Sequence, residues 1–330
     1  MADFVLAGDI GGTKTRLGIF AKGKTSRPLL RYKAIYSSRK SERLEEIIAD
    51  FLGRHQVSIG AVCLGVAGAV VKGKVKATNL PWKVSEDSLS QIFSWPRIRL
   101  VNDLVATAYA VPLLRKNELF PLQRGSGGPG LNIGLMAPGT GLGTALLIAN
   151  DGDNYVPVPS EGGHVGFSPH EDDDLELWQA LAQQYGHVSL ERLISGPGLY
   201  NIYCWLRDSG RYDEPAWLAE QLNPENAPRL IAEQGLKEVV PLCSAALEKF
   251  IAIMGAAAGD LALIGMTRGG LFLGGGIPPK ILPKLRESRF IEAFNSKGRL
   301  SDMMPRFPVS VILNDQAALL GAAHCALAHI

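Results

Sequence analysis

The stretch that most constrains this chain lies near its start, where two short apolar runs are joined by a glycine-rich turn. It reads FVLAGDIGGTKTRLGIF over residues 4–20. Two apolar runs of strand length joined by glycines predict a β-hairpin. Glycine tolerates φ > 0 and carries no Cβ atom, so a ligand can approach the backbone of such a turn closely. The pattern therefore predicts either an ordinary hairpin turn or a turn whose successive N–H groups bind an anion.

The residues around this turn favour a phosphate ligand. The Thr13 hydroxyl would add one more donor to an anion site. Asp9 would repel a phosphate group unless a divalent cation lay between them, and Mg²⁺ bridges carboxylates and phosphates in this way. The pattern G-x-x-x-x-G-K-[ST] is absent, so the turn is not a P-loop. Lys14 follows the turn and would either touch phosphate or point to solvent, as most lysines do.

The length and charge of the chain narrow the class of protein. With 330 residues it has room for two domains, each with its own core. A net charge of +2 gives no electrostatic argument for a nucleic-acid or membrane-surface partner. The apolar region 251–273 is interrupted by Asp260 and Arg268 and should not span a bilayer. The start of the chain, with Asp3 and only four apolar residues before Gly8, does not read as a signal peptide.

The cysteines indicate a cellular compartment. Four of them are scattered along the chain with no C-x-x-C pair: Cys63, Cys204, Cys243 and Cys325. This spacing argues against a cysteine-based metal site and fits buried thiols in a reducing environment. We therefore expect a soluble cytoplasmic protein.

In the first third of the chain, apolar runs alternate with helical patterns. Three runs predict further strands: residues 32–36, 59–66 and 98–101. Residues 41–53 predict a helix with Ser41 as its N-cap and Gly53 just past its end. Asn102 and Asp103 end a strand directly before another helical stretch. Such alternation predicts a doubly wound α/β layer.

The middle of the chain repeats the opening pattern. The glycine-rich stretch 123–130 (QRGSGGPG) predicts a linker into a second domain. Residues 132–149 then predict a second hairpin around the turn PGTGLG at 138–143. A second echo pairs IRLVND at 98–103 with VILND at 311–315, each directly before a helical stretch. Two such repeats indicate a duplicated ligand-binding unit.

The remainder of the chain reads as mainly helical. Helices are predicted over residues 175–185, 189–194, 199–207, 235–263 (with a break at Pro241) and 316–328. Residues 269–273 predict a strand that ends in three glycines, and Pro278 would begin the next helix. The acidic run 170–174 predicts a solvated loop. The terminal helix is expected to return to the first domain.

Seven segments together resemble the bacterial glucokinases of the sugar kinase, Hsp70 and actin superfamily. They are GDIGGTKTRLGIF, VNDLVATAYAVP, APGTGLG, EGGHVGF, GHVSLERLISGPGL, GGGIPPK and LLGAAH, and they run nearly from end to end. The pair EGGHV and GHVS-ER-SGPG is specific to the family. The resemblance implies a two-domain α/β fold of the ribonuclease H-like (actin-like ATPase) type with a ligand cleft between the domains. We predict a small α/β domain, residues 1–115 plus 314–330, and a large one with helical insertions, residues 116–313.

The resemblance also assigns the glycine turns to a nucleotide. Residues 11–13 match the first phosphate motif of the family, residues 139–141 the second, and residues 274–275 the adenosine motif. Without side chains at the last motif, a base and ribose can lie against the backbone. The cofactor-binding positions implied are Asp9, Gly11, Gly12, Thr13, Gly139, Thr140, Gly141, Gly274 and Gly275, with Asp9 near the metal.

The same resemblance implies a sugar site. Its hydroxyl-binding positions are Asn102, Glu161, His164 and Glu191, and Asp103 is the general base. From the residues alone, Asp103 could instead be a helix N-cap and Glu191 a favourable charge at a helix start. A His in the position of His164 ligates zinc in the related repressor, open-reading-frame and kinase family. The C-x-C-G-x-x-G-C cluster of that family is absent here, so we predict no protein-ligated metal.

The predicted activity is the ATP-dependent phosphorylation of glucose to glucose 6-phosphate, the first step of glycolysis, with Mg²⁺. The sequence leaves open a kinase for fructose, mannose or an amino sugar, and ADP or polyphosphate as phosphoryl donor. A sugar-sensing repressor on the same fold would carry an N-terminal helix-turn-helix. The first predicted strand begins at Phe4, which disfavours that alternative. The resemblance further implies a homodimer.

Overall fold

The computed structural model describes residues 4–77, 80–150 and 155–328 of the chain. The chain divides into two compact units. Unit 1 comprises Met1–Glu118 with Asn314–Ile330, and unit 2 comprises Leu119–Leu313. Residues 116–118, which the sequence analysis grouped with the second domain, lie in unit 1, where the Glu118 carboxylate accepts two hydrogen bonds from Arg27.

Unit 1 is built on a five-stranded sheet with the strand order β3-β2-β1-β4-β7. Its strands are β1 (Phe4–Ile10), β2 (Lys14–Ala21), β3 (Leu29–Ser37), β4 (Ile59–Val66) and β7 (Ile98–Asn102). Its helices are η1 (Ser38–Lys40), α1 (Leu44–Gly53), α2 (Glu86–Phe93), α3 (Asp103–Ala110), η2 (Val111–Leu113), η3 (Lys116–Glu118) and α11 (Ala317–Leu327). A small antiparallel pair, β5 (Lys74–Lys76) and β6 (Lys83–Ser85), lies beside them.

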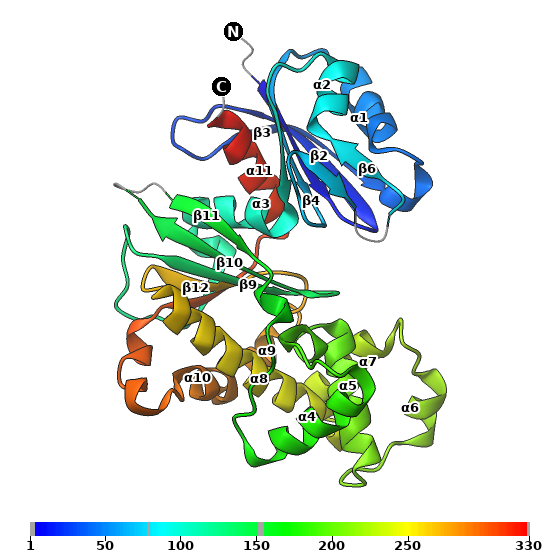
Figure 1. The fold of residues 1–330 in the computed structure, drawn as a ribbon, viewed down its shortest axis with the longest axis vertical. Helices are drawn as coiled ribbons and strands as arrows, with labels where there is room; N and C mark the ends of the chain where they lie inside the picture. The colour runs from blue at the N-terminus through cyan, green and yellow to red at the C-terminus, as the bar shows by residue number, and fades with distance from the viewer. Residues whose placement is uncertain (1–3, 78–79, 151–154, 329–330) are drawn as a thin grey trace. The chain divides into compact units, whose positions relative to one another are not determined.

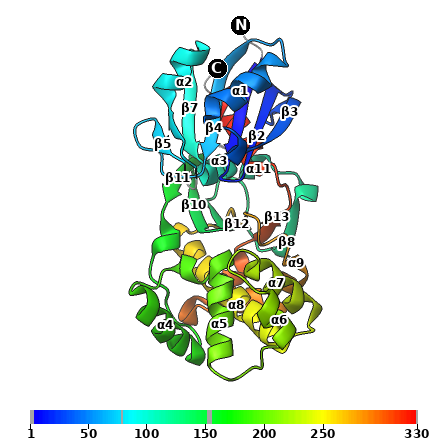
Figure 2. The same cartoon turned by 90° about the vertical axis from the view of Figure 1, so that its right-hand side faces the viewer.

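Helices cover both faces of the unit 1 sheet. Along β1, Leu6 packs in a core that includes residues of α1, whereas Val5 and Ala7 pack in a second core with α3 and α11. Side chains alternate between the two faces of a strand, and here helices cover both faces. Both sets of side chains are therefore buried, which is why β1 is one continuous apolar run. Figure 1 shows α3 beside α11, and Figure 2 shows α1 over the sheet.

The start of α1 differs from the prediction. The helix begins at Leu44 with Arg43 at the N-cap position, and Gly53 is its last residue rather than the residue after it. Ser41 does not cap it, because Ser41 lies two residues before the N-cap and its carbonyl oxygen accepts a hydrogen bond from Trp82 Nε1 at 3.2 Å. The buried Trp82 indole thus holds the backbone at Ser41, just before the helix.

Unit 2 is built on a six-stranded sheet with the order β11-β10-β9-β12-β13-β8. Its strands are β8 (Leu119–Gln123), β9 (Ile133–Pro138), β10 (Leu142–Ala149), β11 (Tyr155–Ser160), β12 (Gly270–Leu273) and β13 (Val309–Ile312). Its α-helices are α4 (Asp172–Tyr185), α5 (Gly196–Asp208), α6 (Ala216–Gln221), α7 (Ala227–Lys237), α8 (Pro241–Gly265), α9 (Leu282–Leu285) and α10 (Ser288–Asn295). Its 3₁₀ turns are η4 (Gly162–His164), η5 (Leu190–Arg192), η6 (Gly298–Leu300) and η7 (Met304–Arg306).

The predicted duplication is present in the sheets. In unit 1, β1 is antiparallel to β2 and parallel to β4, β2 is antiparallel to β3, and β4 is parallel to β7. In unit 2, β9, β10, β11, β12 and β13 repeat the same pairings in the same order. The two echoed segments, β7 before α3 and β13 before α11, therefore occupy equivalent strand positions.

Several predicted boundaries in unit 2 are wrong. The stretch 123–130 is not a linker into a new domain, because Gln123 ends β8 and its Nε2 donates to the carbonyl oxygens of Met304 and Phe307. Residues 189–194 form only the short turn η5, and Pro278 lies in a turn before α9 rather than at a helix start. The predicted break at Pro241 is confirmed, since α8 begins there.

The acidic run is not a solvated loop. Asp172 is exposed, but Asp174 is buried at the start of α4, and Glu171 and Asp174 form a capping box there. The carboxylates of Glu171 and Asp173 are turned toward Lys249, a buried lysine of α8.

Helix α8 is the central helix of unit 2. It is buried along most of its length and packs against α5, α7 and α10. In the described ranges, no single helix is long and apolar enough to cross a membrane, and only α7 and α8 taken together, with a bend of 101°, meet the length and composition of a span.

Candidate active site

The β1–β2 turn of unit 1 presents free backbone donors. Gly11 N donates to Lys14 O at 3.0 Å, which closes the turn, and Ser38 binds it from outside through its Oγ to Gly11 O at 2.8 Å. Ser38 N also donates to Thr13 O. Within the described chain, the N–H groups of Gly12 and Thr13 have no hydrogen-bond partner. A turn that is fixed from outside and keeps two free N–H groups fits an anion.

Asp9 lies at the end of β1, directly before this turn. Its Oδ2 accepts from Arg16 Nη1 at 2.9 Å, across the register pair that Asp9 and Arg16 form between β1 and β2. Burial raises the pKa of the Asp9 carboxyl, the Arg16 guanidinium lowers it, and the negative charge of Asp315 adds to the rise. Within the protein, Arg16 is the counter-ion of Asp9, and it uses one of the two carboxylate oxygens.

Asn102 and Asp103 lie at the junction of β7 and α3. Asn102 is the N-cap, with its Oδ1 accepting from Leu104 N at 2.9 Å and its Nδ2 donating to Gly68 O at 3.1 Å. Asp103 is therefore the first residue of the helix and not its cap. Its Oδ1 also accepts from Leu104 N at 2.9 Å, while Oδ2 has no partner among the described residues.

The electrostatics of Asp103 suit a proton acceptor. Burial raises its pKa above the usual range for aspartate, the hydrogen bond from Leu104 N lowers it, and the negative charge of Asp9 raises it further. A carboxylate that is partly desolvated is a stronger base than one in water, which is how proteins tune general bases.

The β9–β10 turn of unit 2 has the same construction as the first. Gly139 N donates to Gly141 O at 2.8 Å, and Gly139 O accepts from Gly196 N at 2.8 Å. Over the described part of the chain, the N–H groups of Thr140 and Gly141 are without partners. The second predicted phosphate turn thus also offers two free donors.

The predicted adenosine motif lies against this turn. Gly274 N donates to Met136 O at 2.8 Å. Gly275 has φ +79°, and a Cβ atom built on it would come within 2.5 Å of Pro138 O. Only glycine fits there, so the backbone of the motif lies directly beside the residue that precedes the second phosphate turn.

Three predicted sugar-binding residues of unit 2 come from two segments that hydrogen-bond to each other. Glu161 and His164 flank and end η4, where both side chains are exposed. Glu191 lies in η5, and Leu190 N donates to Val165 O at 2.9 Å. The Glu191 Oε2 accepts from Leu142 N at 2.8 Å, which places this carboxylate at the second phosphate turn.

The structure thus groups the predicted residues by unit. Asp9, the 11–13 turn, Asn102 and Asp103 come together in unit 1, and the remaining positions come together in unit 2. Two charged residues of this group, Arg16 and Asp315, were not predicted from the sequence. Asp315 ends the VILND echo of the Asp103 segment, so the repeat itself was the signal, whereas Arg16 is identified only by its register opposite Asp9.

Comparisons with known proteins bear on these two groups of residues. A family model described as Glucokinase matches residues 6–329. The glucokinase of Nostoc punctiforme is 37% identical, over 98% of each chain. The glucokinase of Yersinia enterocolitica is 34% identical, over 98% of this chain and 96% of that protein.

Solved structures agree with these relatives. The crystal structure of a glucokinase from an Antarctic psychrotroph superposes with a TM-score of 0.88 at 33% identity and covers 99% of this chain and 100% of that one. A ROK family glucokinase from Streptomyces griseus, solved in complex with glucose and AMPPNP, has a TM-score of 0.66 at 20% identity over 98% of this chain and 99% of that one. The second likeness concerns the fold alone.

These findings confirm three predictions from sequence: the family resemblance, the actin-like two-domain α/β fold and the class of enzyme, an ATP-dependent hexose kinase. The repressor alternative is not favoured. Because the family model and the relatives cover nearly the whole chain, the chain belongs to the glucokinase family.

Proposed function

We propose that this protein transfers the γ-phosphoryl group of ATP to the 6-hydroxyl of glucose, the first step of glycolysis. The family and its relatives support glucose over fructose, mannose or an amino sugar. The observation that carries the proposal is the repeated turn with two free N–H groups, once in each unit, beside strand-end carboxylates in unit 1. Phosphoryl transfer needs chiefly such positioning and charge neutralisation.

Asp103 is the proposed general base. Its Oδ2 is the carboxylate oxygen without a side-chain partner among the described residues, and its raised pKa reflects burial first. It would accept the proton of the sugar 6-hydroxyl as that oxygen bonds to the γ-phosphorus and the β–γ bridging bond breaks. Asn102, Glu161, His164 and Glu191 would hold the remaining hydroxyl groups, a task for which hydrogen-bonding side chains give strong discrimination.

The glycine turns are the proposed nucleotide site. The free N–H groups of Gly12, Thr13, Thr140 and Gly141 would bind phosphate oxygens, and the backbone at Gly274 and Gly275 would accommodate the adenosine. Asp9, with Oδ1 unpaired among the described residues, and Asp315 are oxygen donors of the kind that Mg²⁺ prefers. A bound Mg²⁺ would neutralise charge on the transferred phosphate.

We further infer that the protein is a cytoplasmic homodimer, that its two units close on the substrates, and that this closure excludes water from the reaction. The four free thiols support a reducing compartment. Exposed apolar side chains in register on β10 and β11, Ile148 opposite Val156, support an interface on unit 2. For the dimer, sedimentation should give twice the chain mass of 35.4 kDa.

For the closure, small-angle scattering should show compaction of the protein when glucose is added.

The function is tested by a coupled assay of phosphorylated product across hexoses and donors, with ATP and glucose expected to give the highest kcat/KM. Asp103→Asn should bind glucose with little change and lose about 10²–10⁴-fold in kcat, because the base is removed and the geometry kept. Calorimetry with glucose is the control for binding. Near-normal turnover of this variant would exclude Asp103 as the base.

A further inference from the structure

The segment Ser195–Gly198 is part of the family-specific motif, yet the proposed mechanism gives it no role. Ser195 is only 1% exposed and is the N-cap of α5. Its Oγ donates to Glu191 O at 2.7 Å and accepts from Gly198 N at 3.0 Å. One hydroxyl group therefore fixes the backbone of Glu191 to the start of a 13-residue helix.

The next residue binds the phosphate turn. Gly196 N donates to Gly139 O at 2.8 Å. The start of α5 thus holds Glu191 on one side and the first residue of the second phosphate turn on the other. Because α5 packs against α7 and the buried α8, this anchor is part of the core of unit 2.

The Glu191 side chain completes the connection. Its Oε2 accepts from Leu142 N at 2.8 Å, at the end of the same turn. A Cβ atom on Gly141 would lie 2.5 Å from this oxygen, so the carboxylate packs directly on the turn. Oε1 has no hydrogen-bond partner among the described residues and is the oxygen left for a ligand.

We infer that Ser195, Gly196 and Glu191 form one brace that ties the sugar-binding carboxylate to the second phosphate turn, so that sugar and nucleotide binding to this protein are coupled within unit 2. The inference rests on the proposed function, because it takes Glu191 as a sugar contact. Ser195 acts in it as a positioning residue. A carboxylate fixed by sugar at Oε1 holds Leu142 N through Oε2 and leaves the turn preordered for phosphate. By linkage, nucleotide must strengthen sugar binding by the same factor.

The first test is hydrogen exchange of the 139–142 peptide with glucose alone. Glucose should slow its exchange in the wild-type protein, because Glu191 then holds the Leu142 amide. Ser195→Ala should abolish this slowing, and Ser195→Thr, which keeps the hydroxyl, should retain it. Ser209→Ala is the matched control, since Ser209 Oγ makes a similar bond, to Leu206 O at 2.7 Å, at the other end of α5.

A second pair of variants covers the case in which Ser195→Ala does not fold. Gly141→Ala would displace the Glu191 carboxylate and should abolish the slowing. Gly139→Ala, in the same turn, introduces a Cβ atom with nothing within 4 Å and should retain it.

The second test is calorimetry of glucose with and without AMPPNP. The nucleotide analogue should tighten glucose binding about five-fold or more in the wild type, and Ser195→Ala should bring this factor close to one. Full slowing and full coupling in both Ser195→Ala and Gly141→Ala would overturn the brace, as would a wild type without either effect. A wild type that binds no glucose at all would instead refute the proposed function, and the brace with it.

Discussion

At the scale of single residues, the two carboxylates of the candidate site in unit 1 differ in whether a positive charge lies beside them. Asp9 has Arg16 at 2.9 Å, whereas Asp103 is stabilised by backbone N–H groups and, among the described residues, by no cation. Burial and the neighbouring Asp9 charge both work against the ionised form of Asp103. The proposed base is thus held in an environment that disfavours its ionised form, and such a loss of stability is common at active sites.

This cost is measurable in the unliganded protein. The pKa of Asp103 in the folded state lies above the unfolded value of 3.8, so the ionised residue lowers stability as pH rises through that raised pKa. Asp103→Asn should therefore melt higher than the wild type at pH 7, by about 1–3 °C, and the difference should shrink toward pH 4.5. Thermal melts at several pH values check this. A lower melting temperature at pH 7 would contradict it.

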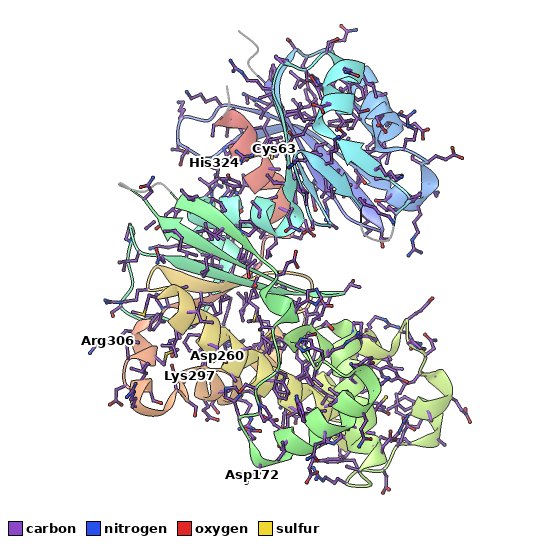
Figure 3. All side chains as sticks on the ribbon, in the orientation of Figure 1. Cys63, Asp172, Asp260, Lys297, Arg306 and His324 are labelled. Atoms are coloured by element: carbon purple, nitrogen blue, oxygen red, sulfur yellow. The ribbon has the colours of Figure 1, made fainter. Side chains whose placement is uncertain are left out.

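At the scale of elements, a buried ammonium group joins α4 to α8. Lys249 of α8 binds Glu171 at 2.7 Å and Asp174 at 3.1 Å, and Asp173 as well, while Arg289 of α10 binds Glu171 from outside. Burial lowers the pKa of Lys249, but the three carboxylates outweigh it and raise the pKa above its usual value. Glu171, Asp173 and Asp174 are the one cluster of acidic side chains in the described ranges whose spacing would suit a metal ion. The ammonium group of Lys249 lies among them. A second ion pair of unit 2 joins Lys297 to Asp260 of α8 at 2.6 Å, and Figure 3 shows these two residues near each other.

Removing this lysine should destabilise unit 2 strongly. Lys249→Met leaves Asp173 and the 3% exposed Asp174 without their cation, and Glu171 with Arg289 alone, at a cost of about 3–5 kcal/mol. Denaturant titration measures the loss. Arg229→Met is the matched control, because its ion pair with Glu233 is exposed and should contribute less than about 1 kcal/mol. Equal effects of the two variants would show that the cluster does not stabilise the fold.

At the scale of the whole molecule, the chain passes from unit 1 to unit 2 after Glu118 and returns before Asn314. These two residues are hydrogen-bonded: Asn314 Nδ2 donates to Glu118 Oε1 at 2.8 Å. Arg27, from the segment between β2 and β3, donates to both Glu118 oxygens at 2.6 and 2.7 Å. The Arg27–Glu118 ion pair therefore holds together the two points at which the chain leaves unit 1 and returns to it.

The strength of this ion pair should depend on pH. The hydrogen bond from Arg27 lowers the pKa of Glu118 from 4.5 to about 2, so its stabilisation is complete above the unfolded value and is lost as pH falls toward 2. Glu118→Gln should cost about 1–3 kcal/mol at pH 7. The difference from wild type should decline below pH 4.5 in urea titrations. Glu220→Gln, at an exposed position, is the control, and a difference that does not depend on pH would refute the ionic origin.

The sequence alone determined the features that depend on residue type and local spacing. Apolar periodicity, glycine and proline act over a few residues, so their effects can be predicted from the sequence. They gave the hairpins, the buried strand β4, the break at Pro241, and the repeat of VND and LND before a helix. The family motifs supplied the site positions that no local pattern could give. Helix starts were less accurate: Ser41 does not cap α1, and its carbonyl oxygen instead accepts a hydrogen bond from the indole of Trp82, 41 residues away.

Only the tertiary structure decided how charges are paired. The acidic run 170–174 reads as solvated because no lysine or arginine is close to it in sequence, yet its partner Lys249 lies 75 residues beyond Asp174. Arg16 became the counter-ion of Asp9 through strand register, and Glu191 reached Leu142 N across 49 residues. Electrostatic and hydrogen-bond partners are set by distance in space, whereas sequence patterns report neighbours along the chain.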